Sequence, residues 1–317
     1  GTAQIWEIVP ARAAVQLLQV EAGLRAIQPT PDCQRVVFAA EDQTLQMWDL
    51  NQGQPVWSSI NLDSLPRILA VSSDGDLIFT ACENLTARVW DATTGKPVAG
   101  PMSQTNKITQ AIFSPDGSYV LTAADDNIVR VWKTKDASLV SQLKGPENHI
   151  IQDVSFSPDS QMVASAYSDG SAELWDAVSG RVSTNRIQHS PMIICIRFSP
   201  DGQLVATASG YEAGLWDAAT GKALTPPLRS VYPMISVEFS ADGQQLLTLS
   251  GVPPGVLQGS GDQLKWEARV WETATGKATS AAMRFEAEDA FAHFSPDGQW
   301  VLTASELICT MTRRGIA

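Results

Sequence analysis

The stretch that decides the fold is Thr109 to Trp132, TQAIFSPDGSYVLTAADDNIVRVW. It predicts three short strands: an apolar run, a Ser-Pro-Asp-Gly turn, a second apolar run, a polar turn at Asp125 and Asp126, and an alternating strand that ends in Trp132. A unit of this size cannot bury both of its faces alone. It therefore requires neighbours of the same kind along the chain.

Two markers from this stretch recur at a fixed period. The tryptophan that ends the alternating strand appears as Trp6, Trp48, Trp90, Trp132, Trp175, Trp216 and Trp271, with gaps of 42, 42, 42, 43, 41 and 55 residues. The turn after the first strand appears as TPDC from Thr30, SSDG from Ser72, SPDG from Ser114, SPDS from Ser157, SPDG from Ser199, SADG from Ser240 and SPDG from Ser295. Seven anchors in register with seven turns predict seven propeller blades of four strands each.

Most anchors continue as Trp-Asp, and on these residues the chain resembles the WD40-repeat family over nearly its whole length. The versions WDATTGK from Trp90, WDAATGK from Trp216 and FSPDG from Phe113 are similar to repeats common in bacterial members. Such repeats often sit beside signalling domains. The resemblance implies an all-β fold, a seven-bladed β-propeller of four-stranded antiparallel blades, formed as a single domain by residues 1–317.

The ends of the chain are expected to complete one blade together. Six internal units are predicted at 21–62, 63–104, 105–146, 147–187, 188–228 and 229–283. Residues 1–20 supply only a third and a fourth strand, TAQIWEI and AVQLLQV, whereas 284–306 supply a first and a second strand. In the family such ends commonly share a blade, which removes the exposed ends of the stack of sheets.

Two segments break the repeat. The insertion from Ser250 to Glu267, SGVPPGVLQGSGDQLKWE, is rich in glycine and proline and predicts a loop. After Ser305 the expected Trp-Asp strand is replaced by ELICTMTRRGIA. This segment could pair as a strand only by competing with TAQIWEI, so we expect a tail on the surface.

Glycine-lysine and glycine-arginine pairs follow the anchors and invite comparison with a nucleotide-binding loop. Such a loop needs Ser or Thr after the lysine and a helix beyond it, but Ala223 and Ala278 stand there and no helix is predicted. Turn chemistry explains the pairs better. The glycines are expected to adopt positive φ in short hairpins: Gly95, Gly180, Gly221 and Gly276.

Composition narrows the classes of partner. The net charge is −12 and the pI is near 4.7, which argues against a surface that follows nucleic-acid phosphates. No run of 18 apolar residues predicts a membrane span. The four cysteines have neither metal-ligand spacing nor a disulfide pattern: Cys33, Cys82, Cys195 and Cys309. Because Gly1 opens the chain inside a predicted strand, we expect a processed or excised end.

The family often carries a hydrogen-bonded set in each blade: a His before the first strand, a Ser or Thr in the second, an Asp in the next turn, and the Trp. Two units match it in part: Ser165, Asp169 and Trp175 in the fourth, with Glu147 at the His place, and His189, Thr207 and Trp216 in the fifth, with Gly210 near the Asp place. No unit matches completely, so packing and closure are expected to stabilise the fold more. A structural role fits these residues better than a catalytic one.

The three histidines do not predict a hydrolytic site, which would need a nucleophile, a base and an orienting group together. His149 and His189 lie in corresponding connections of adjacent units, and a two-His metal site with an acid is the minor alternative to structural roles. His293 lies in a first strand and is expected in the wall or core. No cofactor is predicted.

The runner-up to a non-catalytic function is a small-molecule, metal or catalytic site at the centre of the propeller. That site would need polar groups converging from several first strands, which here are mostly apolar. Asp153, Arg197 and Glu238 are the exceptions that could face the centre.

One face of the predicted ring carries two candidate binding surfaces. The first combines basic residues before the first strands with acidic residues in the turns of the same units: Arg25, Arg67, Lys107, Glu41, Glu83 and Asp125. These side chains either neutralise one another as solvated pairs, which is the favoured interpretation, or form a mixed-charge rim for a peptide or domain.

The second surface is expected on the opposite side of the ring, in the fifth and sixth units. It is aromatic and aliphatic: Tyr211, Tyr232, Val252, Val256, Leu257 and Trp266. These side chains either form a satellite cluster that stabilises the long loop or form a hot spot for a partner. The sequence as a whole predicts a non-catalytic scaffold that presents its loops to a protein, a peptide or a linked domain of a longer signalling chain.

Overall fold

The computed structural model describes residues 2–6, 15–19, 23–183, 186–189, 191–252, 265–286, 291–295, 298–305 and 308–313. Throughout these residues the regular secondary structure is β-strand. The chain divides into two compact units, 1–143 and 144–317. The border falls near the end of the third predicted repeat, three residues before its last residue at position 146.

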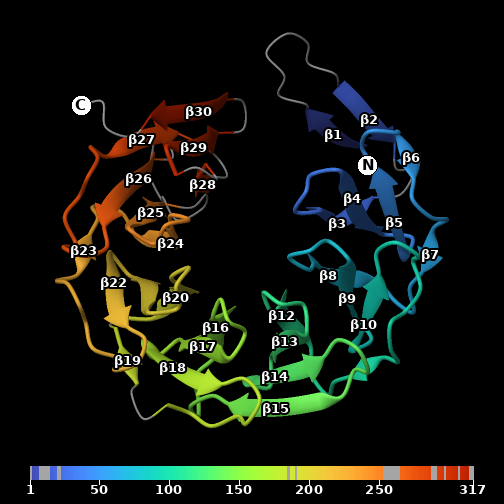
Figure 1. The fold of residues 1–317 in the computed structure, drawn as a ribbon, viewed down its shortest axis with the longest axis horizontal. Helices are drawn as coiled ribbons and strands as arrows, with labels where there is room; N and C mark the ends of the chain where they lie inside the picture. Colours follow the sequence, from blue (N-terminus) through green and yellow to red (C-terminus); the bar gives the residue numbers. More distant parts are fainter. Residues whose placement is uncertain are drawn as a thin grey trace, which may run out of the picture. The chain divides into compact units, whose positions relative to one another are not determined.

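The first unit consists of one hairpin and three complete antiparallel sheets (Figure 1). The hairpin pairs β1 (Thr2–Trp6) with β2 (Val15–Gln19). The sheets are formed by β3 (Leu24–Pro29), β4 (Arg35–Ala40), β5 (Thr44–Asp49), β6 (Gln54–Pro55) and β7 (Ile60–Asn61); by β8 (Pro66–Val71), β9 (Leu77–Cys82), β10 (Thr86–Asp91) and β11 (Met102–Ser103); and by β12 (Ile108–Phe113), β13 (Tyr119–Ala124), β14 (Ile128–Lys133) and β15 (Leu139–Lys144).

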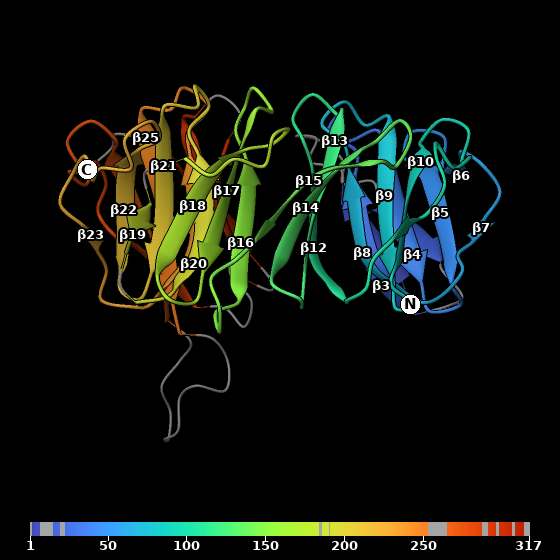
Figure 2. The same cartoon turned by 90° about the horizontal axis from the view of Figure 1, so that it is seen from below.

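The second unit holds three four-stranded sheets and one three-stranded sheet. They are formed by β16 (Ile151–Phe156), β17 (Met162–Tyr167), β18 (Ser171–Asp176) and β19 (Ile187–Gln188); by β20 (Ile193–Phe198), β21 (Leu204–Ser209), β22 (Glu212–Asp217) and β23 (Leu228–Arg229); by β24 (Met234–Phe239), β25 (Gln245–Gly251), β26 (Lys265–Glu272) and β27 (Met283–Glu286); and by β28 (Phe291–Phe294), β29 (Trp300–Ser305) and β30 (Ile308–Arg313). Within this unit the strands of each sheet stand side by side, with connecting loops at their two ends (Figure 2).

Local sequence explains the turn between the first and the second strand. In the β20–β21 turn the Ser199 amide donates to the Leu204 carbonyl at 2.9 Å, and the Ser199 hydroxyl donates to Asp201 Oδ1 at 2.5 Å. Gly202 closes this turn with a φ of 72°. The predicted positive φ of the hairpin glycines is also confirmed, at 67°, 67°, 65° and 67° for Gly95, Gly180, Gly221 and Gly276.

Neighbouring sheets within a unit pack mainly through the first strand of one sheet against the first and second strands of the sheet before it. Leu174 of β18 and Ala164 of β17 lie in one cluster with Ile196 of β20 and Val205 of β21, and each is at most 1% exposed. Fully burying an aliphatic side chain of the size of leucine or isoleucine contributes about 1.5–3 kcal/mol. Because both faces of the second strands from β4 to β25 are covered, these strands are buried at every residue after the first, as in β21.

Every sheet from β3 to β27 has a bulge after the first residue of its first strand, as between Ile193 and Cys195 in β20. A bulge bends a strand and redirects the side chains beside it. The loop that precedes each first strand therefore lies against the turn between the second and third strands, because Ile193 pairs with Ser209 and Met234 pairs with Ser250. These paired loops and turns form the edge on which the candidate site lies.

Two sequence predictions need correction. The C-terminal segment is not a free tail: β30 pairs with β29 from Trp300↔Arg313 to Ser305↔Ile308, because the open edge of β29 offers its backbone groups to an alternating segment. The predicted loop from Ser250 to Glu267 is too long at both ends. Gly251 still pairs with Trp266, so strand structure extends to Gly251 and resumes at Lys265.

The blade shared by the two ends of the chain stays a prediction. Among the sheets of the described residues, β1 pairs with β2, and β29 pairs with β28 and β30. The hairpin β1–β2 has the anchor Trp6 of a third strand, whereas β28 and β29 carry the turn of a first and second strand.

Candidate functional site

The anchor tryptophans are hydrogen-bonded inside the sheets. In five sheets the indole Nε1 donates to a Ser or Thr hydroxyl of the second strand at 2.8–3.0 Å: Trp90 to Thr80, Trp132 to Thr122, Trp175 to Ser165, Trp216 to Thr207 and Trp271 to Thr248. Trp48 instead donates to Gln46 within its own strand at 3.3 Å. Incomplete polar sets in the sequence therefore still retain their buried Trp–hydroxyl pair.

His189 extends one of these pairs. Its Nδ1 lies 3.0 Å from Thr207 Oγ1, and its ring meets the ring of Trp216 edge-on at 5.6 Å. Its Nε2 lies 3.9 Å from Glu212 Oε2. Burial lowers the pKa of His189, and the Glu212 carboxylate opposes that shift only in part. The predicted His–Thr–Trp set is thus confirmed, with Glu212 on the far side of the ring.

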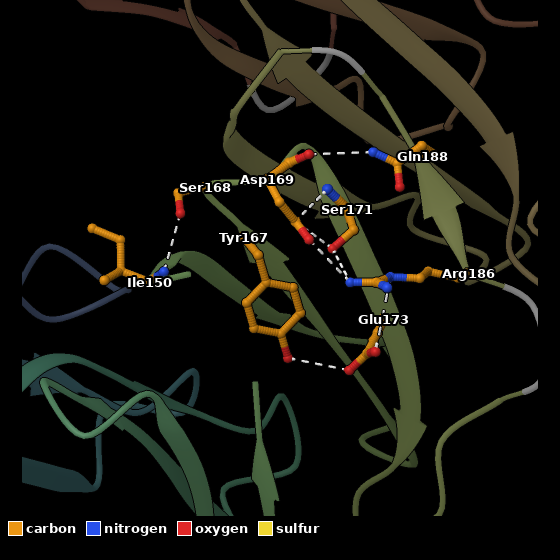
Figure 3. A network of polar contacts seen from close by, with 8 residues as sticks. All are labelled: Ile150, Tyr167, Ser168, Asp169, Ser171, Glu173, Arg186 and Gln188. Atoms are coloured by element: carbon orange, nitrogen blue, oxygen red, sulfur yellow. Dashed lines mark hydrogen bonds and ion pairs between the residues drawn. The ribbon is translucent and has the colours of Figure 1, made fainter. Parts of the chain in front are cut away.

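The predicted set in the fourth repeat is arranged differently. Asp169 does not join Ser165 and Trp175; it accepts hydrogen bonds from the Ser171 amide at 2.9 Å and the Ser171 hydroxyl at 2.5 Å. Arg186 also binds it, at 3.2 Å from Oδ2 (Figure 3). Burial alone would raise the pKa of Asp169, but these hydrogen bonds and the Arg186 charge hold it below its ordinary value. Asp169 therefore serves the turn and the neighbouring fourth strand.

Figure 3 also shows a buried phenol beside this group. The Tyr167 hydroxyl donates to Glu173 Oε2 at 3.4 Å, and Arg186 Nε lies 3.9 Å from Glu173 Oε1. Burial, reinforced by the Glu173 charge, raises the pKa of Tyr167 above its ordinary value. A tyrosine whose pKa is raised is a poor general base at neutral pH, so this network supports structure rather than catalysis.

The charged residues of the first strands bind neighbouring sheets. Asp153 Oδ2 accepts from the Ile196 amide at 2.8 Å and from Arg197 Nη1 at 2.5 Å. Glu238 Oε2 lies 2.8 Å from His293 Nδ1, and the 63% exposure of the His293 side chain excludes the core and leaves the wall of its predicted places. These groups join successive sheets, and the charge of Glu238 also acts on Arg197. No group of three possible metal ligands occurs among the described residues.

The mixed-charge surface of the first unit is largely self-paired. Arg25 Nε lies 3.4 Å from Glu41 Oε1, and Arg67 Nε lies 3.2 Å from Glu83 Oε1. The third pair is joined through its backbone, where the Asp125 amide donates to the Lys107 carbonyl at 2.9 Å. Exposed pairs of this kind contribute about 0–1 kcal/mol each. The observed contacts fit the predicted mutual pairing.

The second unit has a different surface on the same type of edge. Four apolar side chains remain exposed there, and we call them the loop arc: Ile150 at 61%, Met192 at 38%, Tyr211 at 58% and Val231 at 66%. Ile150, Met192 and Val231 lie just before or near the start of first strands, and Tyr211 lies in the β21–β22 turn. Their exposed fractions show that these four side chains face solvent instead of packing in the core.

Backbone hydrogen bonds connect the loops that carry the loop arc. The Ser168 amide donates to the Ile150 carbonyl at 3.0 Å, and the His189 amide donates to the Gly170 carbonyl at 2.8 Å. Further along, the Ser230 amide donates to the Tyr211 carbonyl at 3.0 Å. The four side chains are thus held on successive loops whose mutual positions are fixed by main-chain contacts.

Two glycines allow these loops to approach closely. A Cβ at Gly170, whose φ is 80°, would lie 2.0 Å from the His189 carbonyl oxygen and 2.3 Å from that of Pro191. A Cβ at Gly210 would lie 2.9 Å from the Pro191 ring. The Ser209 hydroxyl donates to the Pro191 carbonyl at 3.0 Å. The loop before β20 therefore packs closely against both the β17–β18 turn and the β21–β22 turn.

The predicted aromatic and aliphatic surface is only partly present. Tyr211 is exposed, whereas Tyr232 and Val252 are half-buried. Trp266 is 5% exposed and packs in strand β26 with Leu247 and Leu249, so it is a core residue rather than a loop residue. The predicted sites Val256 and Leu257 lie outside the described residues.

Sequence reasoning missed three members of the loop arc, Ile150, Met192 and Val231. They lie one to three residues before the first strands β16, β20 and β24, where an apolar residue is easily taken for the start of the strand. Counting back from the recurring Phe-Ser-Pro-Asp turn could have placed them in the preceding loops, since the first strands have a nearly constant length.

The chain is similar to known proteins in both sequence and fold. The family model described as WD domain, G-beta repeat matches residues 64–91, 95–133, 137–176 and 181–217, and each match ends one residue after an anchor tryptophan. No curated protein matched in a search of that group. Among solved structures, the computationally designed Ika8 protein is similar in fold, with a TM-score of 0.76 and 20% identity over 99% of this chain and 90% of that chain.

Among the described residues no helix is long and apolar enough to span a bilayer. The repeated Trp-Asp anchors, the four-stranded antiparallel sheets and the matched repeats agree with one another. Four repeats of the chain, within residues 64–217, match the WD40 family, and the chain has the fold of a β-propeller.

Proposed function

We propose that this chain is a non-catalytic scaffold whose loop arc binds a protein partner, either a separate protein or peptide or a linked domain of a longer chain. Members of the WD40 family generally mediate interactions between proteins, which supports the general class of function. The observation that carries the specific proposal is the exposure of four apolar side chains on loops that hydrogen bonds hold in place.

Rigid loops favour binding because less conformational freedom is lost when a partner docks. Burying what remains exposed of the four side chains would contribute roughly 3–6 kcal/mol before the costs of association. Those costs are about 4–15 kcal/mol, so the loop arc can be the apolar centre of an interface but not all of it. Polar groups nearby can complete the rim, such as Arg229, which is 77% exposed and lies 2.9 Å from Glu212.

The alternative of a site built from charged residues of the first strands has less support. Asp153 and Glu238 already bind Arg197 and His293 and the backbone of the next sheet. Recruiting them for a ligand would break these contacts. Their present arrangement supports a role in holding sheets together.

Capture of partners from cells tests the proposal when a matched control is included. One variant carries Ile150→Ser, Tyr211→Ser and Val231→Ser, and the control carries Val178→Ser and Leu224→Ser, which change apolar residues of similar exposure outside the loop arc. A protein retained by the wild type and the control but lost from the arc variant supports the proposal. Its dissociation constant, measured with the purified partner, should rise at least tenfold in the arc variant. Equal retention by the arc variant, or equal loss from the control, contradicts it.

A further inference from the structure

His189 lies within the loops of the loop arc and has one nitrogen without a hydrogen bond. Its side chain is 6% exposed, and Nε2 is buried with no partner within hydrogen-bond distance. The closest acidic group to that nitrogen is Glu212 Oε2, at 3.9 Å. A titratable ring is thus buried beside an acid to which it makes no hydrogen bond.

The hydrogen bonds around the ring suit its neutral form. Thr207 Oγ1 already accepts the Trp216 indole N–H at 2.8 Å, so the Thr207 hydroxyl hydrogen is free to be donated to His189 Nδ1. In a protonated ring both nitrogens are donors. The Thr207 oxygen would then receive two N–H groups, and its own hydrogen would lose its acceptor. Thr122 of the β12–β15 sheet accepts two N–H groups in the same way, from Trp132 and Gln104, so the main cost of protonating His189 is the burial of its charge.

Charged groups from the surrounding elements do not fully compensate for a buried cation. Glu212 of β22 faces the ring, but its other oxygen binds Arg229 at 2.9 Å. From the β17–β18 turn comes Asp169, which Arg186 already binds. Burial lowers the pKa of His189 from its ordinary 6.5, and Glu212 raises it less than burial lowers it.

The loop of His189 has little room to move. Its carbonyl oxygen lies so close to Gly170 that even a Cβ there would be 2.0 Å away. On the other side, the Gly210–Glu212 turn is attached through the Ser230 amide, which donates to Tyr211, and the Met234 amide, which donates to Gly210 at 2.6 Å. When His189 takes up a proton, the loop that carries it cannot shift toward Gly170. We therefore expect the Gly210–Glu212 turn to move instead.

We propose that His189 and Glu212 form a pH-responsive element, in which proton uptake by His189 loosens the attachment of the Gly210–Glu212 turn to the neighbouring loops. The element would regulate the surface that the proposed function uses, because that turn carries Tyr211. It does not depend on a partner, so it is tested on the chain alone, and its failure is distinct from a failure of partner binding.

The difference in the pKa of His189 between the closed and the opened state determines how strongly the opening constant depends on pH. An opened state in which His189 regains its ordinary pKa binds a proton more readily than the closed state. The opening constant should therefore rise up to about tenfold per pH unit as the pH falls below 6.5, until the closed state itself is protonated. Above pH 6.5 the opening constant should not depend on this group.

The chain supplies its own control for the histidine. In the β12–β15 sheet the corresponding place is held by Gln104, whose Nε2 donates to Thr122 Oγ1 at 2.8 Å. A His189→Gln variant can therefore keep the bond to Thr207 without a group that titrates. Hydrogen exchange of the Ser230 and Met234 amides, corrected for the intrinsic pH dependence of exchange, is measured from pH 7.5 to pH 5 in both proteins.

The expected result is a fall of at least threefold in the protection of both amides in the wild type at low pH, with no such fall in His189→Gln. The same pH dependence in both proteins would overturn the proposal. In a parallel NMR titration His189 should titrate below pH 6.5, and Glu212→Gln should move its midpoint to still lower pH because an opposing negative charge is lost. A midpoint at or above 6.5, or one unmoved by Glu212→Gln, would also overturn it.

Discussion

Replacing Gly170 with alanine should break the contact on which the loop arc depends. The new Cβ would lie 2.0 Å from the His189 carbonyl oxygen, and the backbone φ of 80° also disfavours alanine. The backbone term costs about 1–2 kcal/mol, and the steric overlap adds about 1–3 kcal/mol as in overpacked interiors. The loop before β20 would have to move away from the turn, which would weaken the 2.8 Å bond from the His189 amide to Gly170.

A Gly117→Ala variant separates the steric cost of the new methyl group from the cost of placing alanine at a positive φ. Gly117 has a similar φ of 70°, but a Cβ there would meet nothing closer than Asp74 Oδ2 at 3.8 Å. Urea unfolding followed by circular dichroism should show that Gly170→Ala loses about 2 kcal/mol more than Gly117→Ala. The corresponding extra fall in Tm is about 4–8 °C for a unit of this size. Equal losses in the two variants would refute the close approach of the loop and the turn.

Three further outcomes are expected. Trp216→Phe should lose about 1–2 kcal/mol more than Trp48→Phe, measured by urea unfolding, because only the former leaves a buried hydroxyl without its donor; equal losses would contradict this. The pKa of Asp201 is held below its ordinary 3.8 mainly by the Ser199 hydroxyl, so its stabilising effect should be complete above pH 3.8 and lost as the pH falls through its lower native pKa. Asp201→Asn should flatten that acid limb of a stability–pH curve, and an unchanged limb would count against the turn geometry. Burial raises the pKa of Cys195 to about 11, so native protein should react with a thiol reagent at exposed Cys33 and not at Cys195; modification of both at equal rates would contradict the burial.

The features that are predictable from sequence are those that repeat locally. The Ser-Pro-Asp-Gly turn is formed by hydrogen bonds within six residues, such as those from Ser199 to Leu204, so its residues identify it wherever it occurs. The pairing of Arg25 with Glu41 was also predictable, because the repeat places the start of a first strand beside the turn that ends the second. Fold class and mutual charge pairing follow from such regularities.

Features that depend on partners distant in the chain were not predictable. Trp266 follows a glycine- and proline-rich segment, and only its pairing with Gly251 places it in a strand and in the core. The segment Ile308–Arg313 lacks the repeat's anchor, yet it pairs with β29 because that edge is available in the second unit. The exposure of a loop residue is equally hard to predict from the sequence. Val231 is apolar and precedes a strand, and its 66% exposure depends on what packs against the loop.

Site-specific photo-crosslinking to the captured partner tests most directly whether the loop arc is the surface that binds it. A photoreactive phenylalanine analogue replaces Tyr211 or Val231 in the loop arc, and Val178, which is 53% exposed in the β18–β19 turn, serves as the control position. A crosslinked complex is expected from both positions of the loop arc and none from Val178. Crosslinking from Val178 alone, or equally from all three positions, would contradict it.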